Sequence, residues 1–296
     1  MKTMILSLLC LLATHVAEAK NGFYPTRFSQ ILESVAPQQQ TATSKLVYFG
    51  GPVIGNVKIV VVFWGSKVDA PTQSGIGDFY TAVTKSSYMD WLKEYNTDIK
   101  AVDGRDGTNQ QIGRGSYAGA ITIQPKVTSG TIDDAAIQDE LQAQIDSGKL
   151  PKPDGNTLYM TYFPPGLKIT AFGAASCSEF CAYHGFKGDP KSDHFYYGVM
   201  PDLGGACSFG CGFAAHMTNV TAISSHEFIE AITDPFPTPG TTPAYPQAWN
   251  TTDGSEAGDL CAGTNNTLKA GSKTFAVQSE WDNSANGCTK QSWSAN

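Results

Sequence analysis

The placement of the cysteines limits what this chain can fold into more than any other sequence feature. The chain has 296 residues and seven cysteines, of which six follow position 170. Two C-x3-C segments, CSEFC and CSFGC, are followed by two single cysteines. In an exported chain, six cysteines indicate three disulfides among fifteen connectivities. We expect cross-pairing within the first four and a bridge between the last two, with a C-x3-C zinc site as the alternative. The six are Cys177, Cys181, Cys207, Cys211, Cys261 and Cys288.

The N-terminus carries the pattern of an export signal. A lysine precedes an apolar run (MILSLLCLLA), and an A-x-A cleavage motif follows it. We expect a signal peptide over residues 1–19 and a secreted protein, either extracellular or periplasmic. The apolar run is shorter than the roughly 18 residues of a membrane helix, so we expect no stable membrane insertion. Residues 20–45 are rich in Gln, Ser and Thr, and we expect a polar leader there, before a single domain over residues 46–296.

Composition excludes two classes of protein. A hydrophobic share of 41% is too high for intrinsic disorder. Twenty Lys and Arg against 27 Asp and Glu give a net charge of −7, and there is no basic run. A nucleic-acid partner is therefore not expected. We expect a monomer.

The order of predicted elements indicates an α/β (α+β) fold. The run KIVVVFW at Lys58–Trp64 is continuously apolar after its lysine and bounded by glycines, as in a strand buried on both faces. Strands and helices then alternate, which predicts a mixed sheet with covering helices. We expect a small C-terminal lobe over residues 235–296. The other predicted strands are 118–123, 157–163, 194–200 and 274–281, and the predicted helices are 77–95, 132–145 and 219–233.

The segment from Ser224 to Pro235 (SSHEFIEAITDP) carries the most specific chemical signal. His226 and Glu230 are four residues apart, so on a helix both side chains project from one face. This spacing lets one helix chelate an ion, as in H-E-x-x-H zinc peptidases, and a carboxylate can replace the second histidine. Glu227 would then lie over the open coordination position as the general base. We expect one Zn²⁺ ion as the cofactor.

Two simpler interpretations compete with a metal-binding helix. Ser224 and Glu227 form an S-x-x-E capping box, which needs no metal. In the second interpretation, Glu230 lies on a solvated helix face, where it would also need no metal ion. Phe228 and Ile229 make the segment apolar, however, and buried His and Glu side chains without partners are costly. The metal site is therefore the preferred interpretation.

A three-ligand site needs one more protein donor, and the segment DGSEAGDLC offers two. Glu256 ranks first, because it lies 26 residues after Glu230, within the range of third ligands in gluzincin-type peptidases. Asp259 ranks second, and it is also suited to orient His226 through the free ring nitrogen. Asp234 ranks third, because eight residues along a helix place it about 12 Å from His226.

Other catalytic patterns are weak or missing from the sequence. His184 and Tyr197 are candidates to stabilise an oxyanion, although such residues more often lie in a core or on a surface. The glycines in IGRGSYAG do not lie at a strand-to-helix turn, so no nucleotide-binding site is expected. There is no G-x-S-x-G motif, and the six cysteines are expected to be paired. A serine or cysteine nucleophile is therefore not expected.

Two family resemblances follow from these motifs. The H-E-x-x-E helix resembles the active-site helix of zincin metallopeptidases, which implies a zincin-like domain. Over roughly residues 47–288, the chain is similar in motif order to the EXORDIUM (phosphate-induced) family of secreted or cell-wall proteins, which has bacterial relatives. The plant members lack the His and Glu of this helix, so that resemblance implies a non-catalytic wall-associated protein. The similar segments are VYFGGPV at 47–53, 57–65, CAYH at 181–184, Cys207 with Cys211, AITDPF at 231–236 and Cys288.

The sequence therefore predicts a secreted, disulfide-linked zinc metallopeptidase that acts on peptide or protein substrates. His226, Glu230 and Glu256 would hold the ion, and Glu227 would activate water. The alternative is a secreted binding or cell-surface protein whose helix holds a structural ion or none. A zinc hydrolase of non-peptide amides or esters is a third class.

Overall fold

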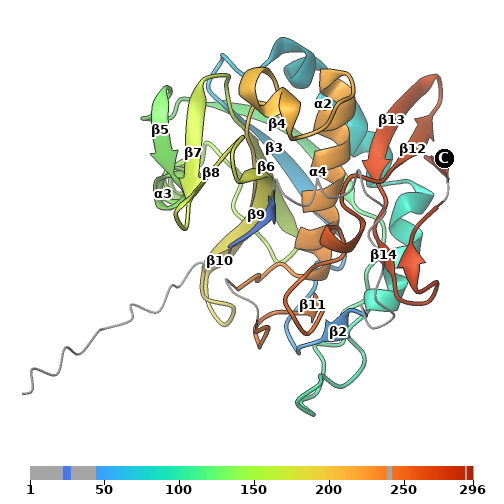
Figure 1. Ribbon diagram of the computed structural model, residues 1–296. Coiled ribbons are helices and arrows are strands. Elements are labelled where there is room, and N and C mark those ends of the chain that lie inside the picture. The colour runs from blue at the N-terminus through green and yellow to red at the C-terminus, as the bar shows by residue number, and fades with distance from the viewer. Residues whose placement is uncertain (1–22, 28–44, 239–241, 291, 296) are drawn as a thin grey trace, which may run out of the picture.

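A six-stranded mixed sheet in the order β1-β9-β10-β6-β3-β4 lies at the centre of the structure (Figure 1). The computed structural model describes residues 23–27, 45–238, 242–290 and 292–295. The predicted signal peptide and most of the predicted leader fall outside the described residues. Strands β10, β6, β3 and β4 run parallel to one another, whereas β9 runs antiparallel to β10 and β1 antiparallel to β9. The strands are β1 (Phe23–Arg27), β3 (Lys58–Trp64), β4 (Ser116–Ile123), β6 (Thr157–Tyr162), β9 (Phe180–Gly188) and β10 (His194–Met200).

Strand β3 is buried on both faces, as its uniformly apolar sequence predicts. Ile59, Val61 and Phe63 belong to one core cluster, and Val60 and the other alternate residues belong to a second. Successive side chains of a strand point to opposite faces, so a strand between two cores needs an apolar residue at every position. Strand β3 thus lies between the two core clusters.

Helices cover both faces of the central sheet, and Figure 1 shows them on opposite sides. Helix α3 (Asp134–Asp146) packs on one face, while α2 (Ala70–Val83) and α4 (His216–Thr233) pack on the other. The α/β prediction is therefore correct. Two of these helices begin at acidic N-caps, where Asp69 accepts from the amide of Thr72 and Asp133 from that of Ala135.

The predicted helix over residues 77–95 is two elements. Helix α2 begins at Ala70, and the 3-10 helix η1 spans Ser87–Tyr95. Thr84 Oγ1 bonds the carbonyl of Tyr80, and Ser86 caps η1 by accepting from the amide of Tyr88. Local side-chain bonds to the backbone therefore end one helix and begin the next, which an apolar period alone does not show.

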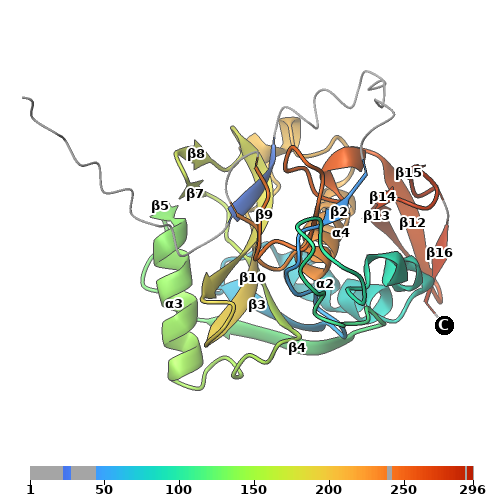
Figure 2. The same ribbon diagram turned by 90° about the horizontal axis from the view of Figure 1, so that it is seen from below.

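The C-terminal part of the chain packs against the outer side of α4. Figure 2 shows α4 between the central sheet and strands β12 and β13, and α4 contacts β9, β10 and β13. Trp281 and Trp293 belong to the same apolar cluster as β3, so this lobe shares the main core. The elements of the lobe are β11 (Trp249–Asn250), η3 (Asp259–Cys261), β12 (Asn265–Ala270), β13 (Lys273–Gln278), β14 (Trp281–Asp282), β15 (Gly287–Cys288) and β16 (Trp293–Ser294).

The remaining short elements lie at the edges of this framework. Strand β2 pairs with β11, and β7 pairs with both β5 and β8. No helix in the described part of the chain is long and apolar enough to cross a membrane. The elements are β2 (Val47–Tyr48), β5 (Gly130–Asp133), β7 (Leu167–Ala171), β8 (Ala174–Ala175) and the 3-10 helix η2 (Gly205–Phe209).

The three predicted disulfides are present. The C-x3-C segments are cross-linked in parallel, and the two single cysteines are bridged to each other. This pattern indicates an oxidising, non-cytoplasmic location. The pairs are Cys177–Cys207, Cys181–Cys211 and Cys261–Cys288.

Candidate metal centre

Helix α4 carries the H-E-x-x-E motif in the middle of the fold. His226, Glu227 and Glu230 all lie within the helix, and each is at most 1% exposed. The helix has apolar groups of the sheet on one side and of the C-terminal lobe on the other. The solvated-face interpretation of Glu230 is therefore wrong. Glu227 lies well inside a helix that begins at His216, so the capping-box interpretation is wrong as well.

His226 and Glu230 face each other as the i, i+4 spacing predicts. His226 Nε2 lies 3.1 Å from Glu230 Oε2. The other carboxylate oxygen, Oε1, accepts hydrogen bonds from the backbone amides of Gly258 and Asp259, at 3.1 Å each. Burial acts to raise the pKa of Glu230, but the adjacent His226 holds it below its usual value. The lobe thus fixes one oxygen of Glu230, and the other remains directed at the histidine.

His184 enters the same cluster from strand β9. Its Nδ1 lies 3.5 Å from Glu227 Oε2 and 3.8 Å from Glu230 Oε2, and its Nε2 lies 3.6 Å from Glu256 Oε1. Its side chain is fully buried. His184 was predicted from the sequence to stabilise an oxyanion, whereas the structure places it among the candidate ligands.

Glu256 reaches the cluster from the lobe, where it shares a donor group with His184 and Glu230 but not with His226. It is fully buried, and neither carboxylate oxygen has a hydrogen-bond partner among the described residues. Burial, then the nearby charge of Glu230, raises its pKa well above the ordinary value. An ionised carboxylate in such a place needs a cation.

Two groups of these side chains have donor atoms close enough to hold a metal ion. One consists of His184, Glu230 and Glu256, and the other of His226, Glu227 and Glu230. Within each group, all the donor atoms lie within 4.8 Å of one another. Glu230 is common to both, so the two groups form one continuous cluster of imidazoles and carboxylates. This buried cluster could hold a metal ion.

The alternative ligands Asp234 and Asp259 belong to neither group. Asp234 accepts hydrogen bonds from the amide of Ala248 at 2.8 Å and the side chain of Asn250 at 2.6 Å, while burial raises its pKa to about 6. Asp259 accepts from the amide of Glu256 at 3.0 Å, and burial raises its pKa to about 7. Both carboxylates hold the backbone around the cluster.

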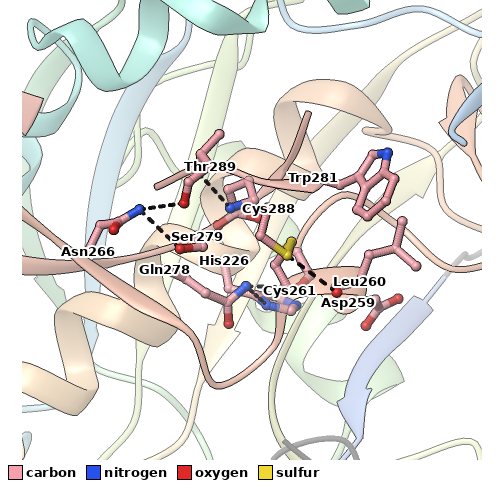
Figure 3. Close-up of a disulfide and its surroundings, with 12 residues drawn as sticks. His226, Asp259, Leu260, Cys261, Asn266, Gln278, Ser279, Trp281, Cys288 and Thr289 are labelled. Atoms are coloured by element: carbon pink, nitrogen blue, oxygen red, sulfur yellow. Dashed lines mark hydrogen bonds between the residues drawn. A yellow bond between two sulfur atoms is a disulfide. The ribbon is translucent and has the colours of Figure 1, made fainter. Parts of the chain in front are cut away.

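The residue that contacts the ring of His226 is Gln278 of β13 (Figure 3). Its Nε2 lies 2.8 Å from His226 Nδ1 and donates to the carbonyl of Gly258 at 3.0 Å. Gln278 thus occupies the orienting position that the sequence analysis assigned to Asp259. It was missed because nothing in the sequence around it suggests a link to a helix 52 residues earlier.

Tyr197 does not reach the cluster, which corrects its assignment as an oxyanion stabiliser. It lies in the second core cluster, under α3, and its hydroxyl donates to Asp134 at 2.8 Å. Tyr183 and Gln138 donate to the same carboxylate. Since neighbouring strand residues alternate between faces, Tyr196 shares the face of the cluster and Tyr197 cannot.

Another buried carboxyl, that of Glu280, lies near the cluster but outside both groups. Glu280 is fully buried and accepts from the hydroxyl of Tyr88 at 3.0 Å. Burial raises its pKa well above the ordinary value. The sequence analysis missed this pair, because its members are 192 residues apart.

The fold and the cluster together define a disulfide-linked α/β protein with a candidate metal centre between a helix, a strand and a C-terminal lobe. Comparisons with known proteins do not narrow this class. No protein-family model matches the chain, and no curated protein or solved structure matches it. The function must therefore be argued from the geometry and chemistry of the cluster.

Proposed function

We propose that the protein is a secreted zinc metallopeptidase. His226, Glu230 and Glu256 would hold the ion, and Glu227 would be the general base. The observation that carries the proposal is the convergence of buried imidazole and carboxylate donors on Glu230. Imidazole nitrogen and carboxylate oxygen suit zinc, which is commonly held by such mixed sets.

The chemistry required is the activation of water beside a peptide carbonyl. A zinc ion bound here would acidify water and polarise the carbonyl. Glu227 is next to His226 in the chain and shares a donor group with His226 and Glu230, so a bound ion would lie close to its carboxylate. Its carboxylate would take the proton from the attacking water and return it to the leaving amine.

The test separates metal binding from hydrolysis. Purified protein is loaded with zinc, its metal content is measured, and cleavage of casein and of a mixed peptide library is followed. Glu227→Gln should retain the zinc but lose at least about 100-fold in rate, because a general base contributes roughly 10²- to 10⁴-fold. Glu280→Gln is the matched control, since Glu280 is equally buried but lies outside both donor groups. If the protein binds zinc but shows no hydrolysis, or hydrolysis that Glu227→Gln leaves unchanged, the peptidase proposal is overturned.

A second function is favoured by the burial of the cluster. All five His and Glu residues are at most 1% exposed. Structural zinc sites are closed by protein ligands, whereas catalytic sites keep one position open. A secreted, non-catalytic binding or cell-surface protein whose helix holds a structural ion would bind zinc, unfold more easily without it and hydrolyse no peptide. The five are His184, His226, Glu227, Glu230 and Glu256.

A further inference from the structure

The five buried donors of the candidate metal centre fall into two groups that share one residue. The helix group consists of His226, Glu227 and Glu230, which all lie on α4. The lobe group consists of His184 on β9, Glu230 on α4 and Glu256 in the C-terminal lobe. Each group has one imidazole and two carboxylates, with donor atoms within 4.8 Å of one another. Each therefore supplies the three protein ligands of a zinc site with one open position.

One ion does not satisfy both groups as the structure places them. Two donors held about 2.0–2.1 Å from one zinc ion lie at most about 4.2 Å apart. The two imidazoles belong to different groups, and so do Glu256 and His226. An ion in the helix group therefore leaves His184 and Glu256 without a metal.

Glu256 shows that an empty lobe group would be costly. The residue is fully buried, and neither carboxylate oxygen has a hydrogen-bond partner among the described residues. His184 Nε2 lies 3.6 Å from Oε1, which is longer than an ordinary hydrogen bond. A buried carboxylate needs hydrogen bonds or a cation to remain ionised. The lobe group thus contains an anionic donor for which the protein provides no hydrogen-bond donor in the described part of the chain.

Glu230 is placed to serve both groups at once. Its Oε1 accepts hydrogen bonds from the amides of Gly258 and Asp259, at 3.1 Å each. Its Oε2 lies 3.1 Å from His226 Nε2 and 3.8 Å from His184 Nδ1. One oxygen therefore faces both imidazoles, and a carboxylate can bridge two cations. Paired metal ions in hydrolases lie about 3.5–4 Å apart.

We propose that the centre holds two divalent ions, one at the helix group and one at the lobe group, with Glu230 as the ligand common to both. The inference rests on the metal centre of the proposed function, extends it from one ion to two, and places Glu256 on the second. It does not depend on peptidase activity. The carboxylates of Glu227, Glu230 and Glu256 carry three negative charges when ionised, which exceeds the charge of one zinc ion.

The contacts of His184 are compatible with an ion at the lobe group. Its Nδ1 lies 3.5 Å from Glu227 Oε2, and its Nε2 lies 3.1 Å from the carbonyl oxygen of Asp234. Metal binding displaces a proton from a ligand, so the ion takes the place of a proton on one ring nitrogen. The other nitrogen keeps its partner, as metal-bound histidines commonly do with a carboxylate or a backbone carbonyl.

The experiment counts the ions and tests whether they are neighbours. The full chain is dialysed to equilibrium against buffered free zinc, and bound zinc is measured per chain. X-ray absorption at the zinc edge is then recorded on the saturated protein, because two ions about 3.5–4 Å apart scatter from each other. We expect two ions in the wild type and a zinc–zinc scattering feature at that distance.

Glu256→Gln should remove the second ion and the zinc–zinc feature while one ion remains. The dissociation constant of the lobe group should rise by roughly 100-fold or more, since losing even an outer-shell partner costs 10- to 100-fold. Glu280→Gln is the matched control, because Glu280 is equally buried but belongs to neither group. It should retain two ions and the feature.

Three results would overturn the inference. A wild type with one ion would leave the carboxyl of Glu256 protonated in place of a second metal. Two ions without the zinc–zinc feature, or two ions in Glu256→Gln, would place the second ion elsewhere on the protein. The wild-type measurements need no variant, so a Glu256→Gln chain that fails to fold does not prevent the test.

The ion count and the peptidase assay fail separately. Two neighbouring ions without hydrolysis that depends on Glu227 would support the inference and reject the peptidase. One ion with hydrolysis that depends on Glu227 would reject the inference and support the peptidase. The two measurements therefore test different statements about the same centre.

Discussion

Gln278 Nε2 lies 2.8 Å from Nδ1 of His226, and the same nitrogen donates to the carbonyl of Gly258 (Figure 3). In this arrangement Nδ1 accepts a hydrogen bond, so a neutral His226 carries its proton on Nε2, which faces Glu230. A histidine that binds an ion through Nε2 needs its proton on Nδ1. Metal binding therefore requires the amide of Gln278 to turn its oxygen toward His226.

This requirement predicts opposite effects for two substitutions of Gln278. Gln278→Leu should weaken zinc binding by about 10- to 100-fold, because the ring of His226 loses its outer-shell partner. Gln278→Glu should bind zinc at least as tightly as the wild type, because a carboxylate accepts from Nδ1 without having to turn. Competition with a chromogenic chelator measures both affinities. Equal affinities for the two variants would contradict the assigned role.

Gly258 leaves room for the ring of His226, and this gives a second prediction. A Cβ at Gly258 would lie 2.6 Å from His226 Nδ1 and 2.9 Å from Glu230 Oε1. Both contacts are shorter than real Cβ contacts, so Gly258→Ala should displace the two side chains and weaken zinc binding by at least about tenfold, or 1.4 kcal/mol. Gly155→Ala is the control, because a Cβ there meets nothing within 4 Å. A Gly258→Ala protein with wild-type affinity would mean that the cluster is not the metal centre.

Removal of the metal should lower the thermal stability of the protein. An ion that binds only the folded chain stabilises it, by about 4 kcal/mol when free metal exceeds the dissociation constant 1,000-fold. Addition of a chelator should therefore lower the Tm of the zinc-loaded wild type. The Tm of Glu230→Ala should not respond to the chelator, because Glu230 belongs to both donor groups. Calorimetry with and without chelator makes the measurement, and a wild-type Tm that the chelator leaves unchanged would count against a bound ion.

The part of the candidate centre that lies on α4 could be predicted from the sequence, because its residues are close together in the chain. His226, Glu227 and Glu230 lie within one turn or so of helix, and the helical period alone brings His226 and Glu230 to one face. The apolar run of β3 was equally clear, since a strand between two cores needs no polar residue. Local spacing was thus sufficient for both elements.

The other half of the centre depends on contacts that no local pattern records. Strand β9 was missed, because Gly185 and Gly188 and a buried histidine interrupt its apolar pattern. Its pairing with β10 places His184 beside α4, and β13 brings Gln278 to His226 from the C-terminal lobe. These positions follow from the packing of the sheet, the helix and the lobe, which only the three-dimensional structure shows.

The Cys181–Cys211 bridge should stabilise both the fold and the metal centre. The parallel Cys177–Cys207 bridge already closes nearly the same loop, so the entropic contribution of Cys181–Cys211 is smaller than the about 3–4 kcal/mol of an independent loop of this length. The double substitution Cys181→Ser with Cys211→Ser should therefore lower the free energy of unfolding by less than that amount. It should also weaken zinc binding, because β9 carries His184. Denaturant unfolding and zinc titration measure the two effects.

The matched control for that bridge is Cys261→Ser with Cys288→Ser. That pair closes a loop with a separation of 27 that neither of the other two bridges shares, so its entropic loss should be at least as large as that of the first pair. It links η3 to β15 and not to β9. Equal losses of zinc affinity in the two double variants would show that the Cys181–Cys211 bridge has no special effect on His184.

Tyr197 supports Asp134 and should affect stability but not catalysis. Burial raises the pKa of Asp134, while the hydroxyls of Tyr183 and Tyr197 act to lower it. Tyr197→Phe removes hydrogen bonds to this carboxyl and should destabilise the protein by about 1–3 kcal/mol. Tyr196→Phe is the control on the other face of the sheet. A loss of turnover in Tyr197→Phe at full stability would restore Tyr197 as a catalytic group.

The loss of stability in Tyr197→Phe should depend on pH, in a direction set by the raised pKa of Asp134. At low pH, Asp134 is protonated in both the folded and the unfolded chain. As the pH rises above about 4, the unfolded chain releases this proton before the folded chain does, so the raised pKa makes the free energy of unfolding fall with increasing pH. Without Tyr197, the pKa of Asp134 rises further and the ionised carboxylate has one donor fewer. The destabilisation by Tyr197→Phe should therefore be larger at pH 7 than at pH 4 in urea titrations, and Asp134→Asn should abolish that difference.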